Sequence, residues 1–152
     1  MKVFLAAPLF SEAEREFNSQ IANRLRGKGF EVWLAQEANF VQHEAHKKKK
    51  LIYEEDMTAL KGSNVVVAIL DGIDVDAGVA FEIGYATALG KPVIGLKTDY
   101  RVFSKMQQVN LMLEIPLMKI CKSIIEVISL LDRKKPALEI IKTTERSENA
   151  HK

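Results

Sequence analysis

The sequence predicts an α/β domain with a five-stranded parallel sheet between two layers of helices. The first observation is the segment from Val65 to Leu70, six apolar residues rich in β-branched side chains, which is typical of a strand buried on both faces. The second is that apolar runs of strand length alternate with helical patterns along the chain. Five strands with this connectivity most often adopt the flavodoxin-like order 2-1-3-4-5, in a three-layer sandwich.

The first half of the chain predicts two strands and two helices. Residues 2–7 form an apolar strand that ends at Pro8, and Ser11 with Glu14 forms an S-x-x-E capping box that begins a helix. The buried stripe of this helix recurs every four residues, at Phe17, Ile21 and Leu25. The remaining elements of this half are a strand, a loop and a helix, at about residues 30–34, 35–43 and 44–60.

The second half centres on a βαβ unit. After the strand at residues 65–70 comes an acidic turn with Asp71, Asp74 and Asp76. A helix follows to residue 89, where Gly90 and Pro92 stop it, and a strand at residues 93–96 closes the unit. The last elements are a loop, a short strand and an amphipathic helix, at about residues 97–110, 115–119 and 120–131. We therefore expect one domain over residues 1–132 and a polar tail over residues 133–152.

Composition and charge exclude several classes of protein. The net charge is +2 with balanced signs, which indicates neither a nucleic-acid nor a membrane partner. No apolar run approaches about 20 residues, and the N-terminus lacks a signal-peptide core of usual length, so a cytoplasmic protein is expected. The single cysteine, Cys121, excludes an internal disulfide and is interpreted as a core thiol at the start of the last helix.

The sequence predicts neither a cofactor nor a metal ion. It contains no G-x-G-x-x-G after the first strand and no G-x-x-x-x-G-K-[ST], which removes the main support for dinucleotide and P-loop sites. His43 and His46 stand beside four lysines without a third ligand, so a solvated basic face is favoured over a metal site. Asp71, Asp74 and Asp76 would suit Mg²⁺, but acidic turns at strand ends often only cap the next helix.

One residue is out of place in the helix of the βαβ unit. Glu82 is the only charged side chain between Asp76 and Lys91, and its neighbours include Phe81 and Ile83. An unpaired buried carboxylate is costly, so the ordinary interpretation is that Glu82 reaches solvent or meets a cation. Because aspartates gather at the carboxyl end of the preceding strand, where open α/β sheets bind ligands, we favour a functional Glu82.

Two carboxylates beside an apolar pocket suit the cleavage of a glycosidic bond. One carboxylate attacks the anomeric carbon, and another acid protonates the leaving group. Asp76 and Glu82 fall within two turns of each other on neighbouring helix faces. Such a reaction needs neither a metal ion nor a cysteine.

The helix also carries a signature of fixed positions, D-x-G-x-x-x-E-x-G-Y-A-x-x-x-G-K-P, from Asp76 to Pro92. The opening VFLAAPLFSEAE and the later segment Asn110-Leu111-Met112 add weaker matches. In these segments the chain, from about Met1 to Leu131, resembles the nucleoside 2-deoxyribosyltransferase family, to which deoxynucleoside 5'-monophosphate N-glycosidases are related.

The resemblance implies roles for several residues. Glu82 would be the nucleophile that takes the 2-deoxyribosyl group, Asp76 would hold sugar hydroxyls and orient Glu82, and Asp71 would exchange a proton with the base. Asn110 would reach the sugar in a neighbouring subunit's site, which implies a homo-oligomer that binds nucleosides or nucleotides and free nucleobases. Further substrate contacts are implied after the first and second strands and in the signature, at Leu9, Phe10, Ser11, Gln36 and Gly78.

Three activities remain open. The first is transfer of the 2-deoxyribosyl group between nucleobases through a covalent glutamyl ester. The second is hydrolysis of the N-glycosidic bond of 2'-deoxynucleoside 5'-monophosphates, for which Ser11 and Arg15 are the only obvious phosphate contacts. The third is a non-catalytic nucleotide-binding module, because Phe4 stands where the family commonly has a tyrosine that supports the nucleophile.

Overall fold

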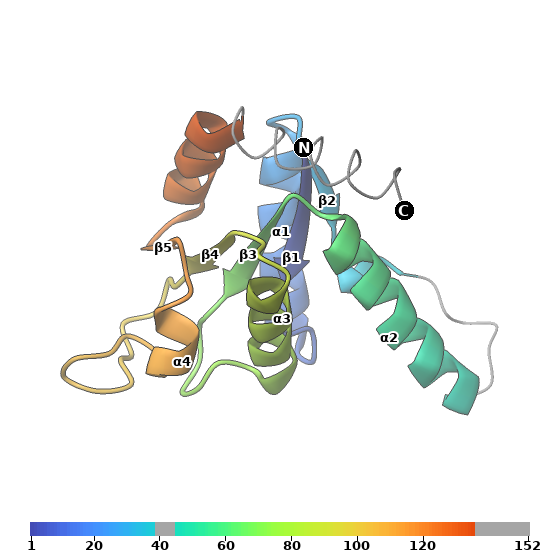
Figure 1. Cartoon of the computed structure of the whole chain (residues 1–152), viewed down its shortest axis with the longest axis horizontal. Helices are drawn as coiled ribbons and strands as arrows, with labels where there is room; N and C mark the ends of the chain where they lie inside the picture. Colours follow the sequence, from blue (N-terminus) through green and yellow to red (C-terminus); the bar gives the residue numbers. More distant parts are fainter. Residues whose placement is uncertain (39–44, 136–152) are drawn as a thin grey trace.

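The computed structural model describes residues 1–38 and 45–135, which form a three-layer α/β sandwich (Figure 1). Its strands are all parallel, in the order β2-β1-β3-β4-β5. Along the chain they are β1 (Lys2–Ala6), β2 (Glu31–Trp33), β3 (Val65–Ile69), β4 (Val93–Leu96) and β5 (Lys119–Cys121). The helices are α1 (Glu12–Arg26), the 3-10 turn η1 (Ala35–Glu37), α2 (Ala45–Gly62), α3 (Ala77–Ala88) and the short α4 (Leu111–Glu114). Residues 124–135 form a last helix.

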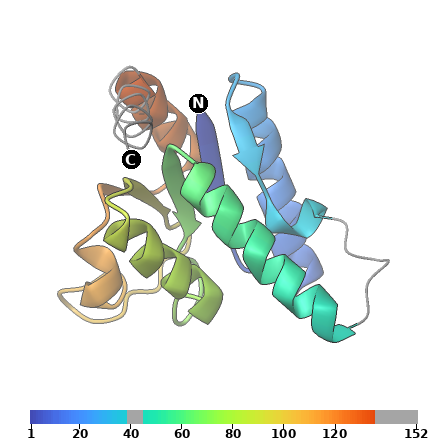
Figure 2. The ribbon, with the colours of Figure 1, turned by 45° about the vertical axis from the view of Figure 1, so that its right-hand side comes forward.

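The helical layers cover opposite faces of the sheet (Figure 2). On one face, α1 and the last helix bury Ile21 and Val127 against the strands. On the other face, α2 and α3 bury Leu60 and Ile83 in a cluster that includes Phe4 of β1. Because helices cover both faces, β3 is buried at every residue, as its uninterrupted apolar run predicted.

The predicted fold class and strand order are confirmed, and so is the start of the first helix. The Ser11 Oγ accepts a hydrogen bond from the Glu14 backbone N–H at 3.2 Å, and the Glu14 carboxylate accepts one from the Ser11 N–H at 2.7 Å. β4 occupies its predicted range residue for residue. The capping box and the apolar run of β4 depend on residues close together in sequence, so tertiary packing does not change where these two elements begin.

The region after β4 differs from the prediction. Residues 111–114 form α4, and the fifth strand lies at Lys119–Cys121 rather than at residues 115–119. Cys121 is therefore the end of a strand and not the start of a helix, although its predicted core position is confirmed. The physical reason is the nearly continuous apolar run in this region, whose periodicity does not separate a short strand from a helix.

Some predictions fall outside the described residues. These are the loop at residues 39–43, the possible metal pair of His43 and His46, whose side chains the structure does not describe, and the tail from residue 136 onward. Residues 133–135, expected in the tail, continue the last helix. No helix among the described residues is long and apolar enough to cross a membrane.

Candidate active site

Asp76 fixes the start of α3. Its Oδ1 accepts hydrogen bonds from the backbone N–H groups of Gly78 at 2.8 Å and Val79 at 3.1 Å. A Cβ atom on residue 78 would lie 3.1 Å from that oxygen, so the glycine leaves room for the cap. The cap therefore sets the residue at which α3 begins and, with it, the helix face on which Glu82 lies.

Glu82 is a partly buried acid in the middle of α3. The helix turns Val79 and Ile83 into the core. Burial, together with the carboxylates of Asp56 and Asp76, raises the pKa of Glu82 to about 8. Within residues 1–38 and 45–135, no cation pairs with this carboxyl and no group donates a hydrogen bond to it. The site thus favours a proton on Glu82 near neutral pH.

Asp56 of α2 is a second acid, whose charge acts on Glu82, and it was not among the residues predicted from the sequence. Trp33 of β2 donates its indole N–H to Asp56 Oδ1 at 3.0 Å. Burial raises the pKa of Asp56, the hydrogen bond from Trp33 opposes this, and Glu55 adds to the rise. One signal was present in the sequence, because Asp56 precedes the core residue Leu60 by one helical turn and so lies beside the buried face of α2.

Phe4 lies beside Trp33 in the sheet. The two residues are register partners in the β1–β2 ladder, and Phe4 is fully buried. Its side chain has no polar atom, so β1 contributes only apolar surface here. Glu82 and Asp56, whose charges interact, are called the acid pair below. The polar contact to this pair comes instead from the neighbouring strand, through Trp33.

Asp71 has a different environment. Its Oδ1 accepts hydrogen bonds from the backbone N–H groups of Thr98 at 2.6 Å and Asp99 at 3.0 Å, and its Oδ2 accepts one from the Thr98 hydroxyl at 2.6 Å. This carboxylate therefore ties the end of β3 to the loop after β4. The acids whose charge acts on Glu82 are Asp56 and Asp76.

The loop after β4 pairs its one acid, Asp99, with cations. Lys97 is only 2% exposed, and its ammonium group binds Asp99. Asp99 also accepts hydrogen bonds from the Gly72 N–H at 2.9 Å and from Arg101 Nε at 2.8 Å. Burial alone would raise the pKa of Asp99, but these donors lower it to about 2. This carboxylate is held in its charged form.

Hydrogen bonds join the segments after β1 and β2. The buried Asn18 donates from Nδ2 to the Pro8 carbonyl at 2.8 Å and to Gln36 Oε1 at 3.1 Å. Gln36 Nε2 donates in turn to the Arg15 carbonyl at 2.8 Å and to Ser19 Oγ at 2.9 Å. Gln36 therefore holds η1 against α1.

Leu9, Phe10 and Ser11 form the turn between β1 and α1. Arg15 Nη1 donates to the carbonyls of Leu9 and Phe10, each at 3.1 Å. The Phe10 side chain is exposed, and the Ser11 hydroxyl takes part in the capping box with Glu14. The turn thus presents apolar side chains, while its polar groups make local hydrogen bonds.

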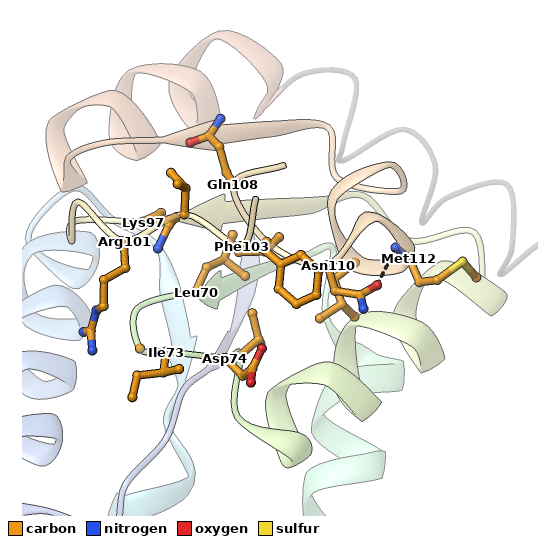
Figure 3. Close-up of a pocket in the computed structure, with 14 residues that line it drawn as sticks. Leu70, Ile73, Asp74, Lys97, Arg101, Phe103, Gln108, Asn110 and Met112 are labelled. Carbon is orange, nitrogen blue, oxygen red and sulfur yellow. Dashed lines mark hydrogen bonds between the residues drawn. The ribbon is translucent and has the colours of Figure 1, made fainter. Parts of the chain in front are cut away.

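Asn110 lies in a cavity of about 430 Å³ between the loops that follow β3 and β4 (Figure 3). Asp74 lines the same cavity, together with apolar residues such as Leu70 and Phe103. Asn110 Oδ1 accepts a hydrogen bond from the Met112 N–H at 3.0 Å and so caps α4. The acids of α2 and α3 do not line this cavity, so one chain does not bring Asn110 and the acid pair into one pocket.

No three His, Cys, Asp or Glu side chains of the described residues are placed to hold a metal ion. Two of the aspartates considered for Mg²⁺, Asp71 and Asp76, accept hydrogen bonds from N–H and O–H groups, and Asp74 lines the cavity.

Known proteins provide an independent comparison. The sequence model of a family described as nucleoside 2-deoxyribosyltransferase matches residues 3–121, which span β1 to β5 and include the acid pair. No curated protein matches the chain.

Several solved structures share the fold. A conserved protein from Enterococcus faecalis V583 is 28% identical, with a TM-score of 0.74 over 88% of this chain and 98% of that one. A 2-deoxyribosyltransferase from Bacillus psychrosaccharolyticus is 25% identical, with a TM-score of 0.75 over 84% and 90% of the two chains. A CMP N-glycosidase from Clostridium botulinum is 24% identical, with a TM-score of 0.57 over 87% and 99%, and shows the fold alone.

Proposed function

The chain belongs to the nucleoside 2-deoxyribosyltransferase family, and on that premise we propose that it transfers 2-deoxyribosyl groups between nucleobases through an ester on Glu82. The observation that carries the proposal is the setting of Glu82, whose pKa is raised by burial and by a second acid, Asp56. The similar structure from Bacillus psychrosaccharolyticus is a 2-deoxyribosyltransferase, which supports the same activity here.

The reaction needs a nucleophile and a group that exchanges a proton with the base. A carboxylate oxygen of Glu82 attacks the anomeric carbon while the bond to the base nitrogen breaks, and the bonding electrons leave with the base. The proton that the free site holds on Glu82 passes to Asp56 before the attack, and Asp56 then gives it to the departing base. In the second step a different base attacks the same carbon, Asp56 accepts that base's proton, and the bond to Glu82 breaks. Both acids return to their starting states.

A proton shared by Glu82 and Asp56 would allow this division of roles. Two carboxyl groups that interact hold a single proton between them over an intermediate range of pH. In that state one group is a carboxylate able to attack, and the other is an acid able to donate. Burial raises the pKa of both Glu82 and Asp56, which moves this range toward neutral pH.

The other implied residues take roles that follow from their contacts. Asp76 uses Oδ1 for the helix cap, so Oδ2 is the oxygen offered to the sugar hydroxyls. The apolar turn at Leu9 and Phe10 faces the base. Gln36 and Asp71 were implied to contact or protonate the base, but their polar groups bind protein, so in this proposal they hold the surrounding loops.

A second chain completes the site in this proposal. Asn110 lies apart from the acid pair of its own chain, and its surroundings expose a group of large apolar side chains that soluble monomers rarely leave in water. These include Ile73, Val102, Phe103, Met106, Met112 and Ile115. Sedimentation of the full chain tests this association, and a monomer at micromolar concentration would contradict it.

Hydrolysis of nucleoside monophosphates is the second candidate activity. It requires groups that bind a phosphate, and Ser11 and Arg15 are the residues implied for that role. Ser11 serves the helix cap, and Arg15 holds two carbonyl groups of its own turn. These contacts favour nucleosides over monophosphates as substrates.

The decisive experiment is a base-exchange assay with a water control. The full chain is incubated with deoxyinosine and free adenine, and the products are separated by chromatography. We expect deoxyadenosine in the wild type and a loss of about a thousandfold in Glu82→Ala, because the covalent step has no other nucleophile. Mass spectrometry of acid-quenched protein should show the sugar ester on the peptide that contains Glu82.

Other outcomes select the alternatives. Release of deoxyribose 5-phosphate from monophosphates only, without exchange, would select the hydrolase. Tight nucleoside binding without turnover would select a binding module, and an active Glu82→Ala protein would remove Glu82 from the chemistry.

A further inference from the structure

We propose that Trp33 is a positioning residue of this site, which holds Asp56 so that one particular oxygen, Oδ2, exchanges the proton with the base. The inference rests on the proposed function, in which Asp56 is the acid. It assigns a role to the chain's single tryptophan, a residue outside the signature of α3.

The fold places the indole of Trp33 at the acid pair. Trp33 ends β2 beside Phe4 of β1 and packs against the apolar cluster under α2 and α3. Its Nε1 lies 3.0 Å from Asp56 Oδ1, across 23 residues of sequence. The donor comes from a strand and the acceptor from a helix, so the contact fixes Asp56 relative to the sheet.

The chemistry of the indole determines which oxygen is left for the reaction. An indole N–H donates a hydrogen bond and cannot accept one. Asp56 Oδ1 must therefore remain an acceptor in both protonation states of the acid. When Asp56 is protonated, its proton has to reside on Oδ2. Trp33 thus selects one of the two otherwise equivalent positions for the proton.

The hydrogen bond from Trp33 also affects the pKa of Asp56. Burial and the charge of Glu55 on α2 favour the neutral form of Asp56, and the charge of Asp56 in turn raises the pKa of Glu82. The indole N–H stabilises the charged form instead. Removing the N–H should therefore raise the pH at which the pair loses its first proton, and should free the carboxyl group to rotate.

The test removes the donor while the ring stays in place. Because the chain has one tryptophan, growth with a benzothienyl analogue of tryptophan replaces the N–H by sulfur at residue 33 alone. The variant Trp33→Phe removes the same donor by mutation. In both proteins we expect the acid limb of the kcat profile to move up by about one pH unit, and kcat to fall about tenfold with KM little changed.

Phe30→Leu is the matched control. It removes an aromatic side chain from a buried position beside β2, in the cluster on the opposite face of the sheet. This variant should lose stability and keep the acid limb in place. An unshifted acid limb in the analogue protein would overturn the inference, even if Trp33→Phe fails to fold.

Tryptophan fluorescence separates this inference from the proposed function. The emission of Trp33 should titrate in the wild type, and Asp56→Asn should abolish that inflection. If the wild type lacks base exchange but the inflection is present, the proposed function fails and the contact stands. If exchange is present and the inflection survives in Asp56→Asn, the inference on Trp33 fails alone.

Discussion

Two groups of acids in this chain have opposite environments. Glu82 and Asp56 share their site with other carboxylates, and burial raises the pKa of both. Asp71 and Asp99, in the loops after β3 and β4, accept several hydrogen bonds each, and Asp99 binds a buried lysine. The comparison shows that proximity to the end of the sheet does not by itself determine the charge state of an acid. Its donors and counter-charges do.

The largest expected effect concerns Asp99, the acid that binds the buried Lys97. Asp99→Ala leaves the ammonium group of Lys97 buried without its partner, which should lower the free energy of unfolding by about 3 kcal/mol. Urea denaturation at pH 7 measures this. Glu31→Ala is the control, because it removes an exposed ion pair with Lys2 and should cost less than about 0.5 kcal/mol. A cost below 1 kcal/mol for Asp99→Ala would remove the structural role given to the loop after β4.

The second prediction separates Asp56 from Asp71. Asp56→Asn removes the exchangeable proton and should lower the exchange rate about a hundredfold. Asp71→Asn replaces one acceptor of a structural contact and should lower the rate less than about tenfold, with a loss of about 1 kcal/mol in stability. Initial rates of base exchange, with melting curves of both proteins, measure the difference. The reverse order of rates would restore Asp71 as the acid that the family resemblance implied.

The third prediction is a dependence of stability on pH. The pKa of Glu82 is raised to about 8 in the folded chain, so the folded state binds this proton more tightly than the unfolded state. Its contribution is full below about pH 4.5 and is lost as the pH rises to about 8. Glu82→Gln cannot lose a proton. Relative to the wild type it should gain about 3 kcal/mol between pH 5 and pH 8, measured by urea denaturation. Equal stability curves would place Glu82 among the solvated acids.

Local patterns predicted most of the fold. The capping box at Ser11, the uninterrupted run of β3 and the stop at Gly90 all depend on neighbours in sequence. The fifth strand and the last helix were misplaced because their apolar residues run together. A usable signal lay in the repeated S-x-x-E pattern at Ser123, whose Oγ accepts a hydrogen bond from the Glu126 N–H at 3.3 Å.

The site was harder to predict than the fold. The sequence alone points to Glu82 as a candidate, because it is the only charged residue among apolar neighbours. Asp56 belongs to a run of three acids, and its difference from Glu55 arises only when α2 packs beside Trp33. For Asp71 the sequence was misleading. Its position after β3 suggested a catalytic role, whereas its hydrogen bonds with Thr98 and Asp99 are seen only in the folded structure.

The cap at Asp76 places a geometric constraint on the turn before α3. Each residue of an α-helix advances about 100° around the axis. One residue inserted between Asp76 and Glu82 would therefore swing the glutamate about a quarter-turn around α3 and away from α2. Insertions before Asp76 carry no such penalty, because the capping contact would restart the helix at the same aspartate. The spacing of six residues, more than the composition of the turn, is what homologous or engineered chains have to keep.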